Sequence, residues 1–279
     1  MENEKNNKRV YNVNDDYFDV INPEQAWLLG ILASDGCISK DRFLVIGQSG
    51  DQGLILIKKI INLLDFEGNI YTIETGFQPF YRIQINSFKI CQRLADFNIV
   101  SNKSLIYTFP KKLPVNMIPY FVAGYIDGDG SIGVYKANRY VKTLVLSVVG
   151  TEKFIIELNQ VLPIKSVPIR KLKAKNCFEL RWHGTNAVEL GEWIWGNDPI
   201  YPSNKFKIMR AWADLEGNEI LKIRNKRLEL KTKVLAEVKA GESVLIVAKN
   251  NGIAFGTIYK WLRKEKNNAS NSKISSSKQ

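Results

Sequence analysis

The sequence predicts an α+β protein made of two related domains, followed by a small all-α module. Two observations predict the paired domains: a twelve-residue segment occurs twice, and the same order of helical and strand-like stretches follows each copy. A third observation, the concentration of positive charge near the C-terminus, marks the module. Since 279 residues can bury two or three compact cores, this division is physically reasonable.

The repeated segment spans residues 27–38 and 121–132. At a constant separation of 94 residues the copies share four identities: Gly30 with Gly124, Asp35 with Asp129, Gly36 with Gly130, and Ile38 with Ile132. Further along, Ser101-Asn102-Lys103 recurs as Ser203-Asn204-Lys205. A unit of about 100 residues is too long for a solenoid repeat, so two tandem domains are predicted.

The first copy opens with a helix over 23–34, because Asn22 suits the N-cap and Pro23 the first helical position. Gly36 predicts a left-handed residue that ends this helix. Apolar and alternating patterns then predict the remaining elements in order: a strand over 43–46, a helix over 54–64, strands over 69–75 and 80–85, and a helix over 88–97.

The second copy repeats this order, with a helix over 118–127, strands over 131–135 and 141–149, a helix over 152–162, strands over 167–173 and 177–182, and a helix over 186–195. The pattern αββαββα therefore occurs twice, each time predicting an antiparallel sheet with helices on one side. The expected divisions are an N-terminal arm (1–19), a first domain (20–112), a second domain (113–217), the all-α module (218–266) and a disordered tail (267–279).

Each copy of the repeated segment is an apolar helix that contains small residues and ends at an aspartate. A glycine costs a helix interior up to about 1 kcal/mol, so its presence predicts a close approach between two helices at the domain interface. Asp35 and Asp129 would then meet at two helix C-termini, where the helix dipoles and mutual repulsion both disfavour carboxylates. A divalent metal ion would compensate, and such a site suits phosphodiester hydrolysis.

The two segments resemble the LAGLIDADG motif, closely over Val122 to Gly130 and more loosely over Leu28 to Gly36. The resemblance covers residues 20–216. It implies a pseudo-symmetric monomer whose two sheets form a saddle on duplex DNA, a homing endonuclease that cuts both strands at a long asymmetric site. It also implies that Asp35 and Asp129 hold catalytic Mg²⁺, with any backbone ligand unassigned. Ala33 stands where the second copy has Asp127, an acid that the resemblance implies to be structural.

The resemblance further implies a basic residue on a strand of each sheet near the scissile phosphates. Arg82 and Arg181 are the candidates. Gln48, at the end of a predicted strand, is the candidate for orienting a water molecule in the first copy. His183 is the single histidine and is interpreted as structural. No intein-type splicing residues are recognised, so we expect a free-standing or intron-encoded protein.

The charge is uneven along the chain. The net charge is +12, and residues 218–279 carry 14 basic against 5 acidic side chains, so this end is expected to bind a polyanion. The pattern over 243–264 resembles a helix-turn-helix, with Thr257 capping the recognition helix and with Ile258, Trp261 and Leu262 facing inward. The candidate DNA contacts are Lys249, Thr257, Lys260, Arg263 and Lys264.

Several classes of protein are disfavoured. No apolar run approaches the roughly 18 residues of a membrane span, and the polar first residues do not look like a secretion signal. Three widely spaced cysteines suggest reduced thiols rather than a disulfide framework or a zinc site. We expect an intracellular protein, in the cytoplasm or nucleoid or in an organelle matrix. Two alternatives stay open: an RNA-binding intron maturase with intron RNA as partner, and a non-catalytic DNA-binding regulator of the same fold.

Overall fold

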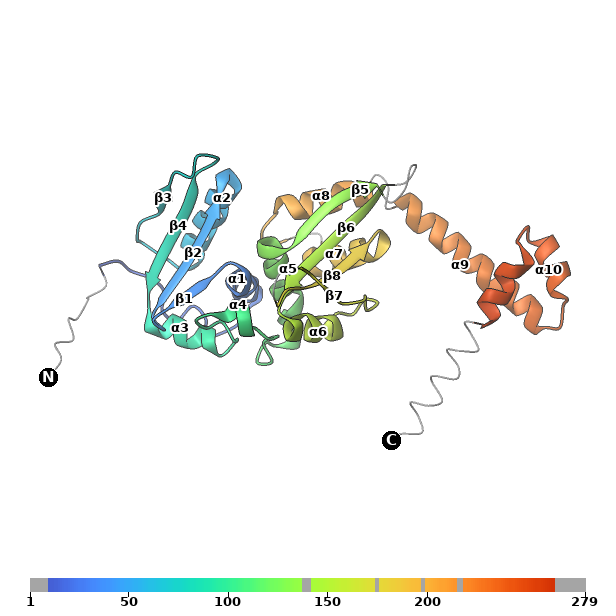
Figure 1. Cartoon of the computed structure of the whole chain (residues 1–279), viewed down its shortest axis with the longest axis horizontal. Helices are drawn as coiled ribbons and strands as arrows, with labels where there is room; N and C mark the ends of the chain where they lie inside the picture. Colours follow the sequence, from blue (N-terminus) through green and yellow to red (C-terminus); the bar gives the residue numbers. More distant parts are fainter. Residues whose placement is uncertain (1–9, 137–141, 174–175, 197–198, 215–217, 264–279) are drawn as a thin grey trace, which may run out of the picture. The chain divides into compact units, whose positions relative to one another are not determined.

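The computed structural model describes residues 10–136, 142–173, 176–196, 199–214 and 218–263. The chain forms two compact units, an N-terminal unit (Met1–Ala213) and a C-terminal unit (Asp214–Gln279), which we describe separately. The N-terminal unit contains both copies of the repeat, and its helices and strands follow one another in the same order twice (Figure 1).

The first half of the N-terminal unit comprises α1 (Pro23–Ser34), β1 (Cys37–Ser39), β2 (Phe43–Ser49), α2 (Gly50–Leu63), β3 (Tyr71–Ile73), β4 (Phe80–Asn86), α3 (Phe88–Ala95) and α4 (Lys103–Ile106). The second half comprises η1 (Val115–Met117), α5 (Ile118–Asp129), β5 (Ser131–Lys136), β6 (Lys142–Gly150), α6 (Glu152–Val161), β7 (Arg170–Lys171), β8 (Phe178–His183), α7 (Thr185–Trp195) and α8 (Asn204–Trp212). The two sheets have the same strand order, β1-β2-β4-β3 and β5-β6-β8-β7, and the strand pairings among the described residues are antiparallel.

The predicted αββαββα order is confirmed, with short elements and the nine-residue helix α8 in addition. The unpredicted β1, α4 and η1 have only three or four residues, too few for a periodic pattern to register. The helix predicted from residue 54 begins at Gly50 instead. Gly53 is needed in the first turn of this helix, because a Cβ there would lie 2.8 Å from the backbone carbonyl carbon of Gln48.

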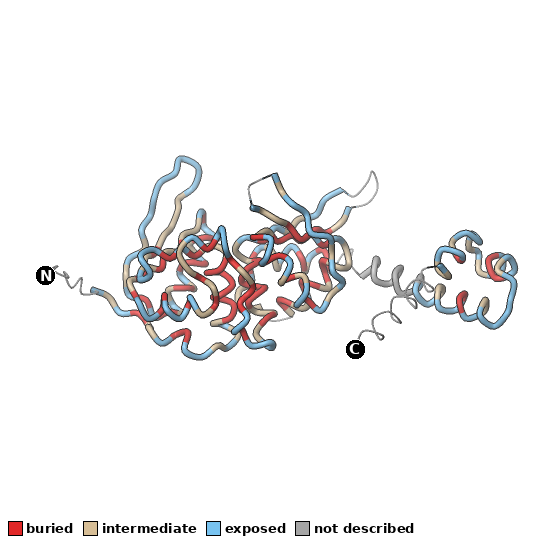
Figure 2. The backbone as a smooth tube through the Cα atoms, turned by 60° about the horizontal axis from the view of Figure 1, so that its bottom comes forward, coloured by how far each residue is buried: buried red, intermediate tan, exposed pale blue. Residues whose placement is uncertain are grey.

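The core of the N-terminal unit centres on α1 and α5. In α1 every residue from Ala26 to Ala33 is buried, which explains why the helix is apolar all round rather than on one face. Asn22 caps α1, accepting hydrogen bonds from the amides of Glu24 (2.8 Å) and Gln25 (3.1 Å). Figure 2 shows buried residues concentrated inside the unit, while β3 and the turn that follows it are exposed.

The glycines that follow the two motif helices differ from the prediction. Neither is left-handed: α1 ends on Asp35 with φ −96° and ψ −13°, and Gly130 after α5 is extended, with φ −68° and ψ 155°. The physical requirement is space instead. A Cβ at Gly36 would lie 2.6 Å from the Leu32 carbonyl oxygen, and one at Gly130 would lie 2.6 Å from the Ile126 carbonyl oxygen.

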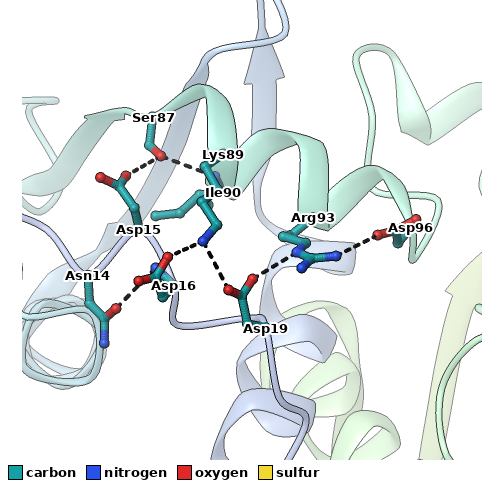
Figure 3. Close-up of polar contacts among 9 residues, drawn as sticks. All are labelled: Asn14, Asp15, Asp16, Asp19, Ser87, Lys89, Ile90, Arg93 and Asp96. Carbon is teal, nitrogen blue, oxygen red and sulfur yellow. Dashed lines mark hydrogen bonds and ion pairs between the residues drawn. The ribbon is translucent and has the colours of Figure 1, made fainter.

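The described part of the N-terminal arm packs on α3 of the first half. Lys89 pairs with both Asp16 and Asp19, and Arg93 donates to Asp19 at 2.8 Å (Figure 3). These pairs are largely exposed, so each contributes little to stability. Phe18, only 3% exposed, buries apolar surface beside them and supplies a larger contribution.

The C-terminal unit consists of α9 (Asn218–Lys239), α10 (Val244–Asn250) and a further helical segment over 255–263. The inward placement predicted for Ile258, Trp261 and Leu262 is confirmed, since all three join a cluster with Val234 and Val247. The predicted cap at Thr257 is wrong: the helix begins two residues earlier, and the Thr257 amide donates to the Ala254 carbonyl at 2.8 Å.

Lys264 and the predicted tail over 267–279 lie outside the described residues. No helix in the described parts of the chain combines the length and the apolar character needed to cross a membrane.

Candidate active site

The two motif helices touch through their glycines. A Cβ at Gly30 would lie 2.1 Å from the Phe121 carbonyl oxygen, and one at Gly124 would lie 1.9 Å from the Trp27 carbonyl oxygen. These separations are far below van der Waals contact, so only glycine allows the backbones to approach this closely. The contacts are reciprocal between the copies, and the predicted helix pair at the junction of the two halves is confirmed.

This pairing brings Asp35 and Asp129 together. The Asp35 Oδ2 atom lies 2.6 Å from the position that a Cβ at Gly128 would occupy, one residue before Asp129. Burial raises the pKa of Asp35 to about 6, and repulsion by Asp129 adds to the shift. The two carboxylates therefore share one electrostatic environment, which lacks positive charge sufficient to keep Asp35 at its ordinary pKa.

Gln48 is the one predicted auxiliary residue that contacts an aspartate directly. It lies near the end of β2, and its Nε2 atom donates a 2.6 Å hydrogen bond to Asp35 Oδ2. This bond favours the ionised carboxylate and holds the Gln48 amide at the site.

Two buried lysines, which the sequence analysis did not assign, reach the same helix ends. Lys103 Nζ donates to the Ser34 carbonyl at 2.9 Å. Lys205 Nζ donates to three consecutive carbonyls, those of Ile126 (2.7 Å), Asp127 (2.8 Å) and Gly128 (2.7 Å). Each ammonium group thus neutralises the negative end of a motif helix.

Both lysines interact electrostatically with Asp35 and Asp129. Burial lowers the pKa of both ammonium groups, while Asp35 and Asp129 oppose that shift. Lys103 also lines a cavity of about 200 Å³ together with Ser34 and Asp129, so this lysine of the first half faces the acid of the second. The repeated Ser-Asn-Lys triplet was the sequence signal that could have identified both residues.

Asp127, the acid present in the second motif alone, ties three helices together. It accepts hydrogen bonds from Trp27 Nε1 on α1 (2.9 Å) and from Ser203 Oγ (2.6 Å). Ser203 in turn caps α8 by accepting from the Phe206 amide at 3.2 Å. Because Lys205 lies in the first turn of α8, the Asp127 side chain fixes the helix that carries the lysine. Burial raises the pKa of Asp127 to about 6.

The two candidate arginines occupy different positions in their sheets. Arg82 is opposite Gly47, two residues before the end of β2, whereas Arg181 is opposite Ser147, three residues before the end of β6. Arg82 Nη2 donates to Gln84 Oε1 at 3.3 Å. Arg181 donates twice to Glu179 Oε1, at 2.7 and 3.2 Å. The structure therefore does not bring them together as symmetry-related partners.

The second sheet carries a hollow of about 510 Å³ on the face away from its helices. Polar side chains from β5, β6 and β8 line it, among them Ser131, Lys136, Thr143, Arg181 and His183. His183, interpreted above as structural, is exposed there. A broad, polar, partly basic hollow suits an extended anionic ligand.

No protein-family model and no curated protein sequence matches the chain. Many solved structures match the chain, among them three LAGLIDADG nucleases. I-SmaMI, a LAGLIDADG homing endonuclease crystallised with uncleaveable DNA, aligns at 12% identity over 74% of this chain and 92% of its own, with a TM-score of 0.50. I-LtrWI bound to target DNA aligns at 14% identity over 76% and 98% (TM-score 0.49), and I-AabMI bound to uncleaved DNA at 15% over 73% and 92% (TM-score 0.48).

The likeness to I-SmaMI concerns the fold, because the sequences have few identities. It agrees with the paired glycine-containing helices, the two equivalent sheets and the aspartates at the helix ends. The chain therefore has the two-motif fold of the LAGLIDADG endonucleases.

Proposed function

We propose that the chain is a site-specific double-strand DNA endonuclease of the homing type. The observation that carries this proposal is the meeting of Asp35 and Asp129 at two adjoining helix ends beside two buried lysines. The I-SmaMI structure contains bound DNA, which supports DNA as the substrate of a chain with this fold. We further propose that the protein acts as a monomer on an asymmetric site, because its two halves differ in sequence and are already joined.

The aspartates suit a hard divalent cation. Within the described residues no three His, Cys, Asp or Glu side chains form a metal-binding group, so a cation would take its other ligands from water and phosphate. Mg²⁺ characteristically uses one or two carboxylates in this way. Asp35 and Asp129 would hold the ion, which when bound activates water and stabilises the leaving oxygen of a phosphodiester. The raised pKa of Asp35 indicates a site that gains from added positive charge.

The residues around the aspartates have separable tasks in this proposal. Lys103 and Lys205 offset the negative helix ends, so two carboxylates and a DNA phosphate can approach one another. Gln48 holds the Asp35 carboxylate in place and can orient a water molecule with its remaining amide atoms. The polar faces of the two sheets would position the duplex.

Cleavage of a randomised plasmid library tests the proposed function. Full-length protein should linearise a small subset of plasmids when Mg²⁺ is present and none when it is chelated. Sequencing the broken ends should recover one long, non-palindromic site. A library that stays supercoiled across several divalent ions and salt concentrations, with protein that is folded and binds DNA, would favour a non-catalytic DNA-binding protein instead.

Lys205 should matter more for folding than Lys103. Lys205→Met removes a cation that satisfies three carbonyls, whereas Lys103→Met removes one that satisfies a single carbonyl. We expect Lys205→Met to lower the free energy of unfolding by about 3 kcal/mol and Lys103→Met by about 1 kcal/mol. Urea unfolding of both variants measures this difference. Equal losses would mean that the Lys205 contacts contribute no more than the single contact of Lys103.

We also propose that the C-terminal unit binds DNA through a helix-turn-helix formed by α10 and the 255–263 helix. The two helices pack on α9 through Val247, Ala248 and Ile258, while Lys249, Lys260 and Arg263 are exposed. Thr257, half-buried in the first turn of the second helix, is the remaining described candidate contact. This arrangement leaves basic side chains free to meet phosphates and bases in a major groove.

Changing these charges within the full-length protein tests the C-terminal unit. A Lys249→Ala/Lys260→Ala/Arg263→Ala variant should flatten the slope of log affinity against log salt by about 2.7, because each lost phosphate contact removes about 0.9. The matched control replaces exposed Lys58, Lys111 and Lys153 of the N-terminal unit by alanine. If both triple variants reduce the slope equally, the effect is one of net charge, and the C-terminal unit is no dedicated DNA contact.

A further inference from the structure

The strand registers of the two sheets define which residues of the two halves are structurally equivalent. Asp35 and Asp129 are equivalent, which aligns Cys37 with Ser131 two residues later. Cys37 pairs with Val45 in the first sheet, and Ser131 pairs with Ser147 in the second. Val45 is therefore equivalent to Ser147, and Gln48 is equivalent to Gly150.

The next strand pairing extends the comparison. Gly47 pairs with Arg82 in the first sheet, and its equivalent Val149 pairs with Glu179 in the second. Arg82 is thus equivalent to Glu179, and not to Arg181. The helix caps agree with this alignment, because Ser49 before α2 and Thr151 before α6 fall at the same offset as Gln48 and Gly150.

The two halves consequently present different chemistry beside their aspartates. The first half has the Gln48 amide, bonded to Asp35 at 2.6 Å. The second half has Gly150, where no side chain fits, because a Cβ would lie 2.7 Å from Phe154 Cδ1 and 3.2 Å from Tyr125 Oη. Asp35 is therefore held by the amide of Gln48, whereas Asp129 has no side chain beside it at the position equivalent to Gln48.

The charge of one equivalent pair of side chains also differs between the two halves. The guanidinium of Arg82 in the first half is replaced by the carboxylate of Glu179 in the second, which is 4% exposed. Glu179 Oε1 accepts two hydrogen bonds from Arg181, and Oε2 lies 3.8 Å from Arg170 without a hydrogen-bond partner. Glu179 therefore adds a buried negative charge and also occupies an arginine that could otherwise contact a phosphate.

In the proposed endonuclease, each half has its own catalytic centre, built around Asp35 in the first half and around Asp129 in the second. We propose that these differences between the halves make the two centres unequal, so that the DNA strands are cut in a fixed order and the first-half centre acts first. The proposal rests on the proposed endonuclease function. Gln48 acts as a positioning residue of the fast centre. Glu179 restrains the slow centre by repelling phosphate and by holding Arg181.

Strand-resolved cleavage tests the order. The probe is a duplex carrying the site recovered from the plasmid library, with a different end label on each strand. For the wild-type protein we expect nicked intermediate to accumulate with all nicks on one strand, the two rate constants differing by about tenfold or more. Gln48→Ala should slow the strand that is cut first. Glu179→Gln should accelerate the other strand and leave the first unchanged.

Matched controls separate these effects from general destabilisation. Gln52→Ala changes an exposed glutamine four residues after Gln48. Glu192→Gln, on α7, breaks the 2.7 Å ion pair with Arg210 of α8. Neither control should alter the ratio of the two strand rates, which uniform loss of folded protein would also leave unchanged. In gel-shift titrations without Mg²⁺, Glu179→Gln should steepen the salt slope by about 0.9, because Arg181 becomes free to pair with a phosphate.

The outcomes separate this inference from the proposed function. Equal rates on both strands of the wild type, or effects of Gln48→Ala and Glu179→Gln on the same strand, would overturn the order while leaving the endonuclease function intact. Absence of any cleavage by folded wild-type protein would overturn both. If Glu179→Gln does not fold, the Gln48→Ala arm alone still decides whether the fast strand depends on the first half.

Discussion

Asparagine at Asp35 or at Asp129 is expected to abolish double-strand cleavage while leaving DNA binding almost unchanged. Both acids lie at the junction of α1 and α5, and together they would provide the carboxylates that hold the metal ion. Losing one of two metal-binding carboxylates should reduce the rate by at least about 10³-fold, the scale of removing a group that stabilises the reacting phosphate. A time course on linearised target DNA measures the rate.

The controls distinguish lost chemistry from lost structure. Gel-shift affinity should stay within about threefold of the wild type, because the contacts that position the duplex come from the sheets. Asp96→Asn is a matched control, since Asp96 pairs with Lys112 and Arg93 away from the motif helices. Wild-type cleavage by Asp129→Asn would exclude that carboxylate from the chemistry. Strongly weakened binding by either motif variant would indicate a positioning role instead.

Alanine at Gly124 is expected to have the largest effect on folding. Its Cβ would lie 1.9 Å from the Trp27 carbonyl oxygen, a backbone atom that cannot rotate away as a side chain could. The motif helices would have to separate, which we expect to cost at least about 3 kcal/mol and to open the junction that holds the aspartates. The measurement is the urea midpoint of unfolding, with cleavage assayed on whatever protein remains folded.

The adjoining residue provides the control. Ala123 is 4% exposed on the same helix, and Ala123→Gly should cost only about 1 kcal/mol, from helix propensity and the lost methyl group. If Gly124→Ala is as stable as Ala123→Gly, the helices tolerate a wider spacing. Glycine at position 124 would then not be required for α1 and α5 to pack together.

Features that depend on local pattern could be predicted from the sequence. The boundaries of α1 follow from the Asn22 cap and Pro23, and the repeat itself located Asp35 and Asp129 at equivalent helix ends. The role of glycine in the helix pair also followed, because its cost inside a helix requires a compensating contact. By contrast, the left-handed conformation expected of Gly36 was wrong, since the decisive factor was a carbonyl from the preceding turn.

Features that depend on contacts between distant residues could not be predicted. Lys103 and Lys205 reach carbonyls more than 60 residues away along the chain, and no local pattern records that contact. Likewise, Arg82 and Arg181 looked equivalent because each lies on the last strand of its half. Only the strand registers reveal that Glu179 is the residue equivalent to Arg82.

Anomalous diffraction from crystals grown with Mn²⁺ and uncleaved target duplex would test the proposed active site most directly. We expect a manganese peak between the motif helices, with carboxylate oxygens of both Asp35 and Asp129 among its ligands and a scissile phosphate oxygen beside it, at distances of about 2.0–2.3 Å. The peak should disappear from crystals of Asp35→Asn soaked under the same conditions. Well-ordered DNA on the sheets with manganese absent from this junction, or bound without either aspartate, would contradict the proposal.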